Sequence, residues 1–104
     1  MKLIINNYKY ELKEAETFYS KLIGLAFKRK TNYALRFRCN GIHTFFMKQN
    51  IDVILTDKDN NILYFYKDFK KNKIILPKRK VYYTYEIPSN LRKYNNPKKI
   101  EINF

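Results

Sequence analysis

An Asn-Gly pair at residues 40–41 separates two apolar and aromatic runs, residues 34–39 and 42–47. Both turn residues accept a positive φ angle, which the tightest hairpin turns require, so this pattern strongly favours a β-hairpin. The register of a two-residue turn pairs the following residues across the strands: Cys39 with Ile42, Arg38 with His43, and Phe37 with Thr44. The middle of the chain is therefore predicted to fold as antiparallel β-structure.

Further strands are predicted on both sides of this hairpin. Asn6-Asn7 separates two short apolar runs within residues 1–13, which predicts a first hairpin. Asn60 lies in a polar segment where a turn needs left-handed geometry. The remaining predicted segments are a hairpin of residues 52–56 and 62–67, a half-buried strand at 81–87, one helical turn at 89–94 capped by Ser89, and a last strand at 99–104.

One stretch changes to helical spacing. From Ala15 onward, Phe18, Leu22 and Leu25 recur three or four positions apart, and Gly24 is placed to end the helix. The sequence therefore predicts an α+β fold. One helix in the N-terminal half packs on a strongly bent, mostly antiparallel sheet, or a small β-barrel, of about seven to eight strands.

Length and composition narrow the class of protein. At 104 residues there is room for one core, so residues 1–104 are expected to form a single domain. Two glycines are too few for a phosphate-binding loop or a dinucleotide fingerprint, and no cofactor or metal motif is present. Cys39 is the only cysteine, and no apolar run resembles a signal peptide or a membrane span. A reducing, cytoplasmic location is expected.

The net charge of +13 favours a polyanionic partner such as nucleic acid. The candidate contacts form two clusters: Lys28, Arg29 and Lys30, and Lys78, Arg79 and Lys80. Tyrosines follow the second cluster and could serve as stacking platforms. A competing explanation is codon usage, because Lys, Asn, Ile and Tyr are all abundant here and all spelled by AT-rich codons. Glu does not balance the lysines, so part of the excess remains unexplained.

Three segments resemble a known family. The run Ile42-His43-Thr44-Phe45-Phe46-Met47 continues through Ile51-Asp52-Val53 to Asp57-Lys58-Asp59, flanked by Gly24-Leu25-Ala26-Phe27-Lys28 and Tyr85-Glu86-Ile87-Pro88-Ser89-Asn90. This pattern resembles the prokaryotic family catalogued as domain of unknown function 192, over residues 12–103. The resemblance implies a recognisable fold without an established activity. The face that carries the motif would consist of His43, Thr44, Met47, Asp52 and Glu86.

Each candidate residue has a functional and a structural interpretation. His43 could carry a proton or bind a metal, or it could bond its hairpin neighbours. Cys39 beside His43 could form a nucleophile–base pair, although the expected register points their side chains to different faces. Asp52 and Glu86 could meet as an acid–base pair or cation site. Alternatively, each is a structural carboxylate, with Lys48 or Arg36 as the expected partner of Asp52.

The function favoured by these observations is a non-catalytic binding or accessory module with an unknown ligand or protein partner. The first alternative is a nucleic-acid-binding or other polyanion-binding protein that uses the two basic clusters. The second is a metal-dependent hydrolase that uses Asp52, Glu86 and His43. Whether the two acids line one cavity distinguishes the last alternative from the others.

Overall fold

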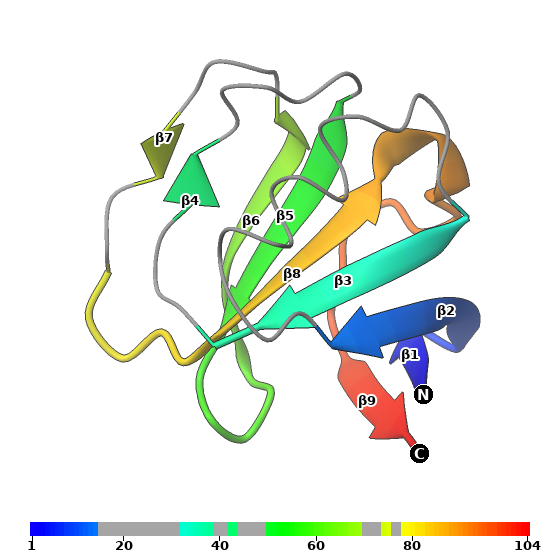
Figure 1. The fold of residues 1–104 in the computed structure, drawn as a ribbon, viewed down its shortest axis with the longest axis horizontal. Coiled ribbons are helices and arrows are strands. Elements are labelled where there is room, and N and C mark those ends of the chain that lie inside the picture. The colour runs from blue at the N-terminus through cyan, green and yellow to red at the C-terminus, as the bar shows by residue number, and fades with distance from the viewer. Residues whose placement is uncertain (15–31, 39–41, 44–49, 70–73, 76–77) are drawn as a thin grey trace.

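The computed structural model of the chain describes residues 1–14, 32–38, 42–43, 50–69, 74–75 and 78–104 (Figure 1). Its elements are β1 (Lys2–Ile5), β2 (Tyr8–Glu14), β3 (Tyr33–Phe37), β4 (Ile42–His43), β5 (Ile51–Thr56), β6 (Ile62–Phe69), β7 (Ile74–Ile75), β8 (Tyr83–Pro88), the 3-10 turn η1 (Ser89–Leu91) and β9 (Ile100–Asn103). Seven strands form one sheet in the order β6-β5-β8-β3-β2-β1-β9, while β4 and β7 pair with each other.

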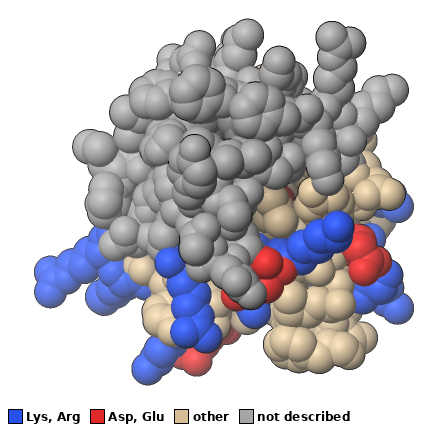
Figure 2. Space-filling view, in the orientation of Figure 1, with Lys and Arg blue, Asp and Glu red and all other residues tan. Residues whose placement is uncertain are grey.

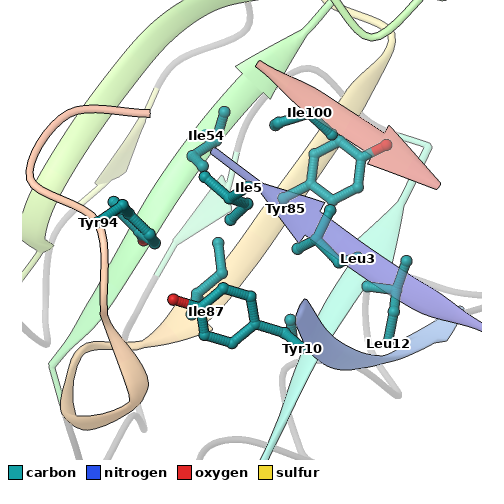
Figure 3. Packing of buried hydrophobic residues seen from close by; sticks show 10 residues of the cluster. Leu3, Ile5, Tyr10, Leu12, Ile54, Tyr85, Ile87, Tyr94 and Ile100 are labelled. Carbon is teal, nitrogen blue, oxygen red and sulfur yellow. The ribbon is translucent and has the colours of Figure 1, made fainter. Parts of the chain in front are cut away.

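The large sheet is antiparallel except between β2 and β3, which run parallel. It curls into a half-barrel, so that β1 and β9 at one end come to face β5 across the interior (Figures 1 and 3). A right-handed twist accumulates from strand to strand and favours such curling.

The inner face of the curl carries the larger core (Figure 3). Its buried residues are Leu3, Ile5, Tyr10, Leu12, Ala34, Ile54, Tyr85, Ile87, Tyr94 and Ile100. Alternate residues of each strand supply this face, because successive side chains point to opposite sides of a sheet. Burial of each large aliphatic side chain contributes about 1.5–3 kcal/mol.

The outer face of the central strands is buried as well. A second cluster contains Tyr33, Leu35, Ile51, Val53, Leu55 and Val81. All residues of β5 are buried, and β8 is buried from its second residue onward. The prediction of a half-buried strand at 81–87 is therefore wrong. Thr84 and Glu86 looked like a solvent-facing row, but they are 0% and 1% exposed.

The predicted α+β fold class is also wrong. The described residues contain no α-helix, only η1, and are dominated by the seven-stranded curled sheet. The helix expected from Ala15 falls in residues 15–31, outside the described part of the chain. Helical spacing is confined to that one segment, whereas strand patterns fill most of the sequence.

The predicted pairing of the segments around Asn40-Gly41 is not found among the described strands. A strand has two edges, and both edges of β3 are taken, one by β2 and the other by β8. β4 pairs with β7 instead, with His43 opposite Ile74. Residues 39–41 lie outside the described residues, as do 44–49. The described part of β3 therefore pairs with strands from other parts of the chain.

Two other turn predictions are confirmed. Asn6 and Asn7 have φ angles of 50° and 73° and join β1 to β2 as a hairpin. Asn60 has a φ of 64° in the turn between β5 and β6. Asparagine tolerates this left-handed conformation better than most residues, which explains how a chain with two glycines makes these turns. The last strand is found at β9.

Within the described residues, no helix combines the length and apolar character that crossing a membrane requires.

Candidate functional site

Asp52 lies at the second position of β5, on the inner face of the sheet. It pairs with Ile87 of β8 and shares its face with Ile54, two residues further along the strand. The side chain is 0% exposed. A buried carboxylate is costly unless hydrogen bonds and an opposite charge compensate it, so its partners decide what it can do.

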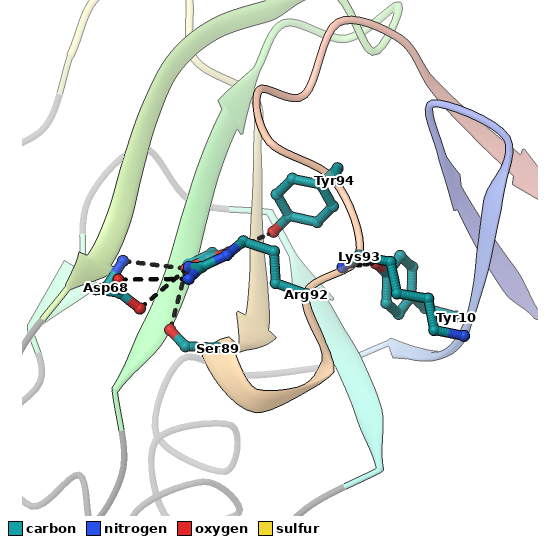
Figure 4. A network of polar contacts seen from close by, with 7 residues as sticks. Tyr10, Asp68, Ser89, Arg92, Lys93 and Tyr94 are labelled. Atoms are coloured by element: carbon teal, nitrogen blue, oxygen red, sulfur yellow. Dashed lines mark hydrogen bonds and ion pairs between the residues drawn. The ribbon is translucent and has the colours of Figure 1, made fainter.

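Four donors surround the Asp52 carboxylate (Figure 4). Oδ1 accepts from the backbone N–H of Asp68 at 3.0 Å, the Ser89 hydroxyl at 3.0 Å and Arg92 Nη1 at 2.8 Å. Oδ2 accepts from the Tyr94 hydroxyl at 2.6 Å. A carboxylate has about four lone-pair sites, so these contacts occupy most of its accepting capacity.

The first of these donors belongs to a β-bulge. Ile51 faces Phe69 and Val53 faces Tyr66, so two residues of β6 stand opposite Asp52 alone. The second of them, Asp68, has a φ of 52°. A bulge leaves one residue out of the hydrogen-bond ladder. The Asp52 carboxylate accepts the N–H of Asp68 and thereby satisfies it.

Arg92 joins the bulge to the segment after β8. Its guanidinium contacts Asp52 at 2.8 Å and Asp68 Oδ1 at 3.1 Å. The hydrogen bond with Asp68 raises the pKa of Arg92 and holds the pKa of Asp68 below its ordinary value. The Arg92 side chain is 21% exposed and that of Asp68 is 45% exposed, so this half of the network borders solvent.

Tyr94 closes the buried end of the network. Its ring packs edge-on against Tyr10 and Phe65, with centroids 6.2 and 6.0 Å away. Burial raises the pKa of the Tyr94 hydroxyl, and so does its bond to Asp52. The hydroxyl of Tyr10 accepts the backbone N–H of Lys93 at 2.9 Å. Both tyrosines thereby tie the chain after η1 to the inner core (Figure 4).

Glu86 lies on the other face of the sheet. It pairs with Val53 of β5 and Leu35 of β3, which both belong to the outer cluster, and it is 1% exposed. Asp52 belongs to the inner face, one position along from Val53. The sheet therefore separates the two acids, and they do not line one cavity.

Other predicted site residues are placed only in part. His43 lies in β4, where its backbone pairs with Ile74, and the described strand pairings include none between His43 and Arg38. Thr44 and Met47 lie outside the described residues, as do Cys39 and the cluster of Lys28, Arg29 and Lys30. Over the part of the chain that the structure describes, no group of three or more His, Cys, Asp or Glu side chains converges to hold a metal ion.

The expected partner of Asp52 is also corrected. Arg36 bonds Glu14 at 2.6 Å, and Lys48 lies outside the described residues. The actual cation, Arg92, is forty residues away in the sequence, and no local pattern connects it to Asp52. Ser89 was expected to cap a helical turn. The turn exists, but Pro88 occupies the cap position without a side-chain bond, and the Ser89 hydroxyl donates to Asp52 instead.

The second basic cluster lies in a turn that leads into β8. The N–H of Val81 bonds the carbonyl of Lys78 at 3.3 Å, and Lys80 at the third position has a φ of 69°. A positive φ at this position alone is the pattern of a type II turn. Lys and Arg side chains gather at the lower left of the face in Figure 2, where Figure 1 places this turn and the turn between β5 and β6.

An open groove of about 400 Å³ lies beside this turn. Its lining combines charged and apolar residues: Asp57, Lys58, Asp59, Leu63, Lys80, Val81 and Tyr82. Tyr82 is 40% exposed, and Tyr64 on the adjacent strand β6 is 41% exposed. Lys78 Nζ lies 5.0 Å from the centre of the Tyr64 ring, and Arg38 Cζ lies 5.6 Å from that of Tyr82. Basic and aromatic side chains therefore share one surface.

No family model matches the chain. A UPF0127 protein of Thermococcus kodakarensis is 36% identical over 101 residues, which cover 86% of this chain and 64% of that protein. A UPF0127 protein of Pyrococcus horikoshii is 34% identical over 98 residues, covering 88% of this chain and 84% of that protein. Another, of Thermococcus sibiricus, is 35% identical over 95 residues, covering 82% and 59%. The chain thus spans less than two thirds of the length of the first and third relatives.

Two solved structures share the fold. A protein of unknown function from Novosphingobium aromaticivorans superposes with a TM-score of 0.77 at 12% identity, covering 98% of this chain and 84% of that one. A protein from Sinorhizobium meliloti, named as a candidate transcription regulator, superposes with a TM-score of 0.74 at 15% identity, covering 96% and 89%. At these identities the likeness concerns the fold alone.

Proposed function

The chain belongs to the UPF0127 family, whose name states no activity, and from that premise we propose that it is a non-catalytic binding or accessory domain. The observation that carries the proposal is the state of Asp52. Its carboxylate is buried and bonded to four donors, three of them side chains and one the N–H of a β-bulge. A group committed in this way supports the fold.

The hydrolase alternative needs a different geometry. A pair of acids that shares a substrate or a metal ion has to reach one point in space. Asp52 and Glu86 point to opposite faces of β5 and β8, so a centre built from both of them would have to span the sheet. This arrangement supports the binding domain over the metal-dependent hydrolase.

We also propose that residues 42–63 carry the segment of the family catalogued as domain of unknown function 192, and that Asp52 in it has a structural role. The turn after β5 supports this proposal. Asp57 Oδ1 accepts from the N–H groups of Asp59 and Asn61, both at 2.9 Å, and Oδ2 accepts from the Asn61 amide at 3.0 Å. Asp52 and Asp57, two of the three acids of the segment, thus accept from backbone N–H groups of their own domain. A cytoplasmic location remains part of the proposal.

Replacement of Asp52 by Asn tests the structural role. The amide keeps the size of the side chain but loses the charge that faces Arg92, so the free energy of unfolding should fall by about 1–3 kcal/mol. Urea unfolding followed by circular dichroism measures the change. Asp59→Asn, an exposed acid in the turn between β5 and β6, is the matched control and should change stability little.

An Asp52→Asn variant that is as stable as the parent, or more stable, would contradict the proposal. Active-site residues often reduce stability, and their replacement relieves that cost. Such a result would favour a functional acid over a structural one.

A second candidate function is polyanion binding, favoured by the exposed basic turn beside the groove. If the turn neutralises several phosphates, affinity for a DNA duplex should fall with salt at a log–log slope on the order of −4 or steeper. Reversal of Lys78, Arg79 and Lys80 to Glu should remove most of the binding. The control reverses the exposed residues Lys9, Lys93 and Lys98. Equal losses in the two triple variants would leave overall charge as the sufficient explanation.

A further inference from the structure

We propose that the groove beside the Lys78–Lys80 turn binds single-stranded nucleic acid. Unpaired bases would stack on Tyr82 and Tyr64, and the surrounding cations would hold the phosphates. The inference rests on the polyanion-binding function proposed above and narrows its ligand to one with accessible base faces.

The exposed tyrosines carry the first part of the argument. Tyr82 and Tyr64 keep 40% and 41% of their surface accessible, whereas Tyr10, Tyr33 and Tyr85 are buried. Tyr82 packs edge-on against Tyr83, with centroids 4.7 Å apart and planes at 78°. The edge of one ring meets the face of the other, and this contact restrains the orientation of both. A fixed, exposed ring is suited to stacking because little conformational freedom is lost on binding.

Cations stand next to both rings. Arg38 lies over Tyr82 and Lys78 over Tyr64, while Lys80 and Lys58 line the groove between the two turns. Single-stranded nucleic acid presents bases and phosphates at short, regular intervals, so a surface that binds it combines aromatic faces with positive charge. A polyanion without bases would use only the cations.

The two acids of the groove offset the charge of Lys58 and Lys80, so the positive excess comes from Arg38 and Lys78 beside the two rings. Asp57 directs both carboxylate oxygens into its own turn, toward Asp59 N–H and the two nitrogens of Asn61. These bonds hold the pKa of Asp57 below its ordinary value, and the charge they stabilise faces the turn. Asp59 remains as one exposed carboxylate among Lys58, Lys80 and their neighbours.

The backbone of the turn shows that codon usage alone does not explain Lys80. Five described residues have a positive φ, and three of them are Asn6, Asn7 and Asn60. Asp68, the fourth, belongs to the buried network. Asparagine is also spelled by AT-rich codons and tolerates this conformation better than lysine. Codon usage alone would therefore allow Asn at position 80 as readily as Lys. The chain has a lysine there despite its conformational cost.

Fluorescence anisotropy with a labelled oligodeoxythymidylate tests the inference on the full chain. Tyr82→Ala should weaken binding by about five- to one-hundred-fold, because the stacking surface is lost. Tyr82→Phe should keep the affinity of the parent, since phenylalanine retains the ring. Tyr8→Ala removes an equally exposed tyrosine on β2 and should have no effect. Lys80→Asn should weaken binding and at the same time raise the unfolding midpoint.

Competition with inorganic polyphosphate distinguishes binding of single-stranded nucleic acid from binding of polyanions in general. We expect the oligonucleotide to bind more tightly than polyphosphate at equal phosphate concentration, and the preference to disappear in Tyr82→Ala. Equal affinity for the two ligands, or an unchanged affinity in Tyr82→Ala, would overturn the single-strand inference while polyanion binding stands. Absence of binding to both ligands would overturn the two together.

Discussion

The network around Asp52 and the turn at Lys80 both place a charged residue where the backbone makes an uncommon bend. At Asp52 the bend is the bulge opposite it in β6, and the charge is enclosed by Arg92 and three further donors. At Lys80 the bend is a type II turn, and the charge faces an open groove. Asp52 accepts the backbone N–H that the bulge leaves out of the ladder. Lys80, in contrast, adopts a left-handed conformation that is unfavourable for its side chain. A charged residue that stabilises its own fold indicates a structural role. A charged residue that strains the fold indicates a functional role, such as binding a ligand.

Removal of the Asp52 side chain should cause the largest change in stability. Asp52→Ala leaves Arg92, the Asp68 N–H and the Tyr94 hydroxyl without their shared acceptor, so the free energy of unfolding should fall by about 3–5 kcal/mol. Urea unfolding checks the value, with Asp59→Ala as control. A loss below about 1 kcal/mol would show that solvent replaces the carboxylate easily, and the network would then resemble the exposed turn.

The second-largest effect is expected at high pH, where the free energy of unfolding should fall as a buried tyrosine ionises. Burial raises the pKa of Tyr85 to about 12, against about 10 in the unfolded chain. A raised folded pKa means that the stabilisation is complete below pH 10 and is lost as the pH rises through 12. The loss should reach roughly 2–3 kcal/mol. Denaturant unfolding between pH 9 and 12 measures it, and Tyr85→Phe, which cannot ionise, should lose less over the same range.

The Tyr94 hydroxyl should account for a smaller part of the network. Tyr94→Phe keeps the ring between Tyr10 and Phe65 but removes the donor to Asp52 Oδ2, so the expected loss is about 1–2 kcal/mol. Comparison with Tyr8→Phe, on an exposed ring, isolates the hydrogen bond. If the two variants lose equal stability, the fourth donor adds nothing to the network.

Replacement of Lys80 in the turn should cause the smallest change in stability, and it should stabilise the protein. Lys80→Asn relieves the left-handed conformation of a long side chain and should raise the free energy of unfolding by about 0.5–1 kcal/mol. Thermal unfolding with Lys58→Asn as control checks the sign. A destabilised variant would mean that Lys80 supports the fold, and the contrast with Asp52 would disappear.

The sequence predicts local turns well and long-range pairing poorly. Asn6, Asn7 and Asn60 take the predicted left-handed conformation because the preference resides in the residue itself. The partners of β3 are different: it pairs with β2 and β8, and no local pattern of the sequence predicted either partner. The choice of partner depends on burial of both faces of the sheet, and a local pattern does not contain that information.

The candidate site shows the same division. The run from Ile51 to Thr56 indicates a buried strand, and Asp52 within it is buried next to a cation. Its partner was wrong because Arg92 and Tyr94 reach it through the fold of the whole chain. Asp52 and Glu86 seemed able to meet because both belong to motif segments. The alternation of side chains across paired strands puts them on opposite faces, and only the register reveals this.

The interrupted pairing of β6 also affects the exposed edge of the sheet. Among the described strands, β6 is the last one at its end of the sheet, and such a strand is a template on which another chain can add a strand. Its ladder with β5 shifts register twice, between Ile51 and Val53 and between Leu55 and Thr56. Each shift bends the strand and breaks the even spacing of backbone groups that an incoming strand would need. The bulge that Asp52 satisfies from within thus also makes this edge a poorer template for an incoming strand.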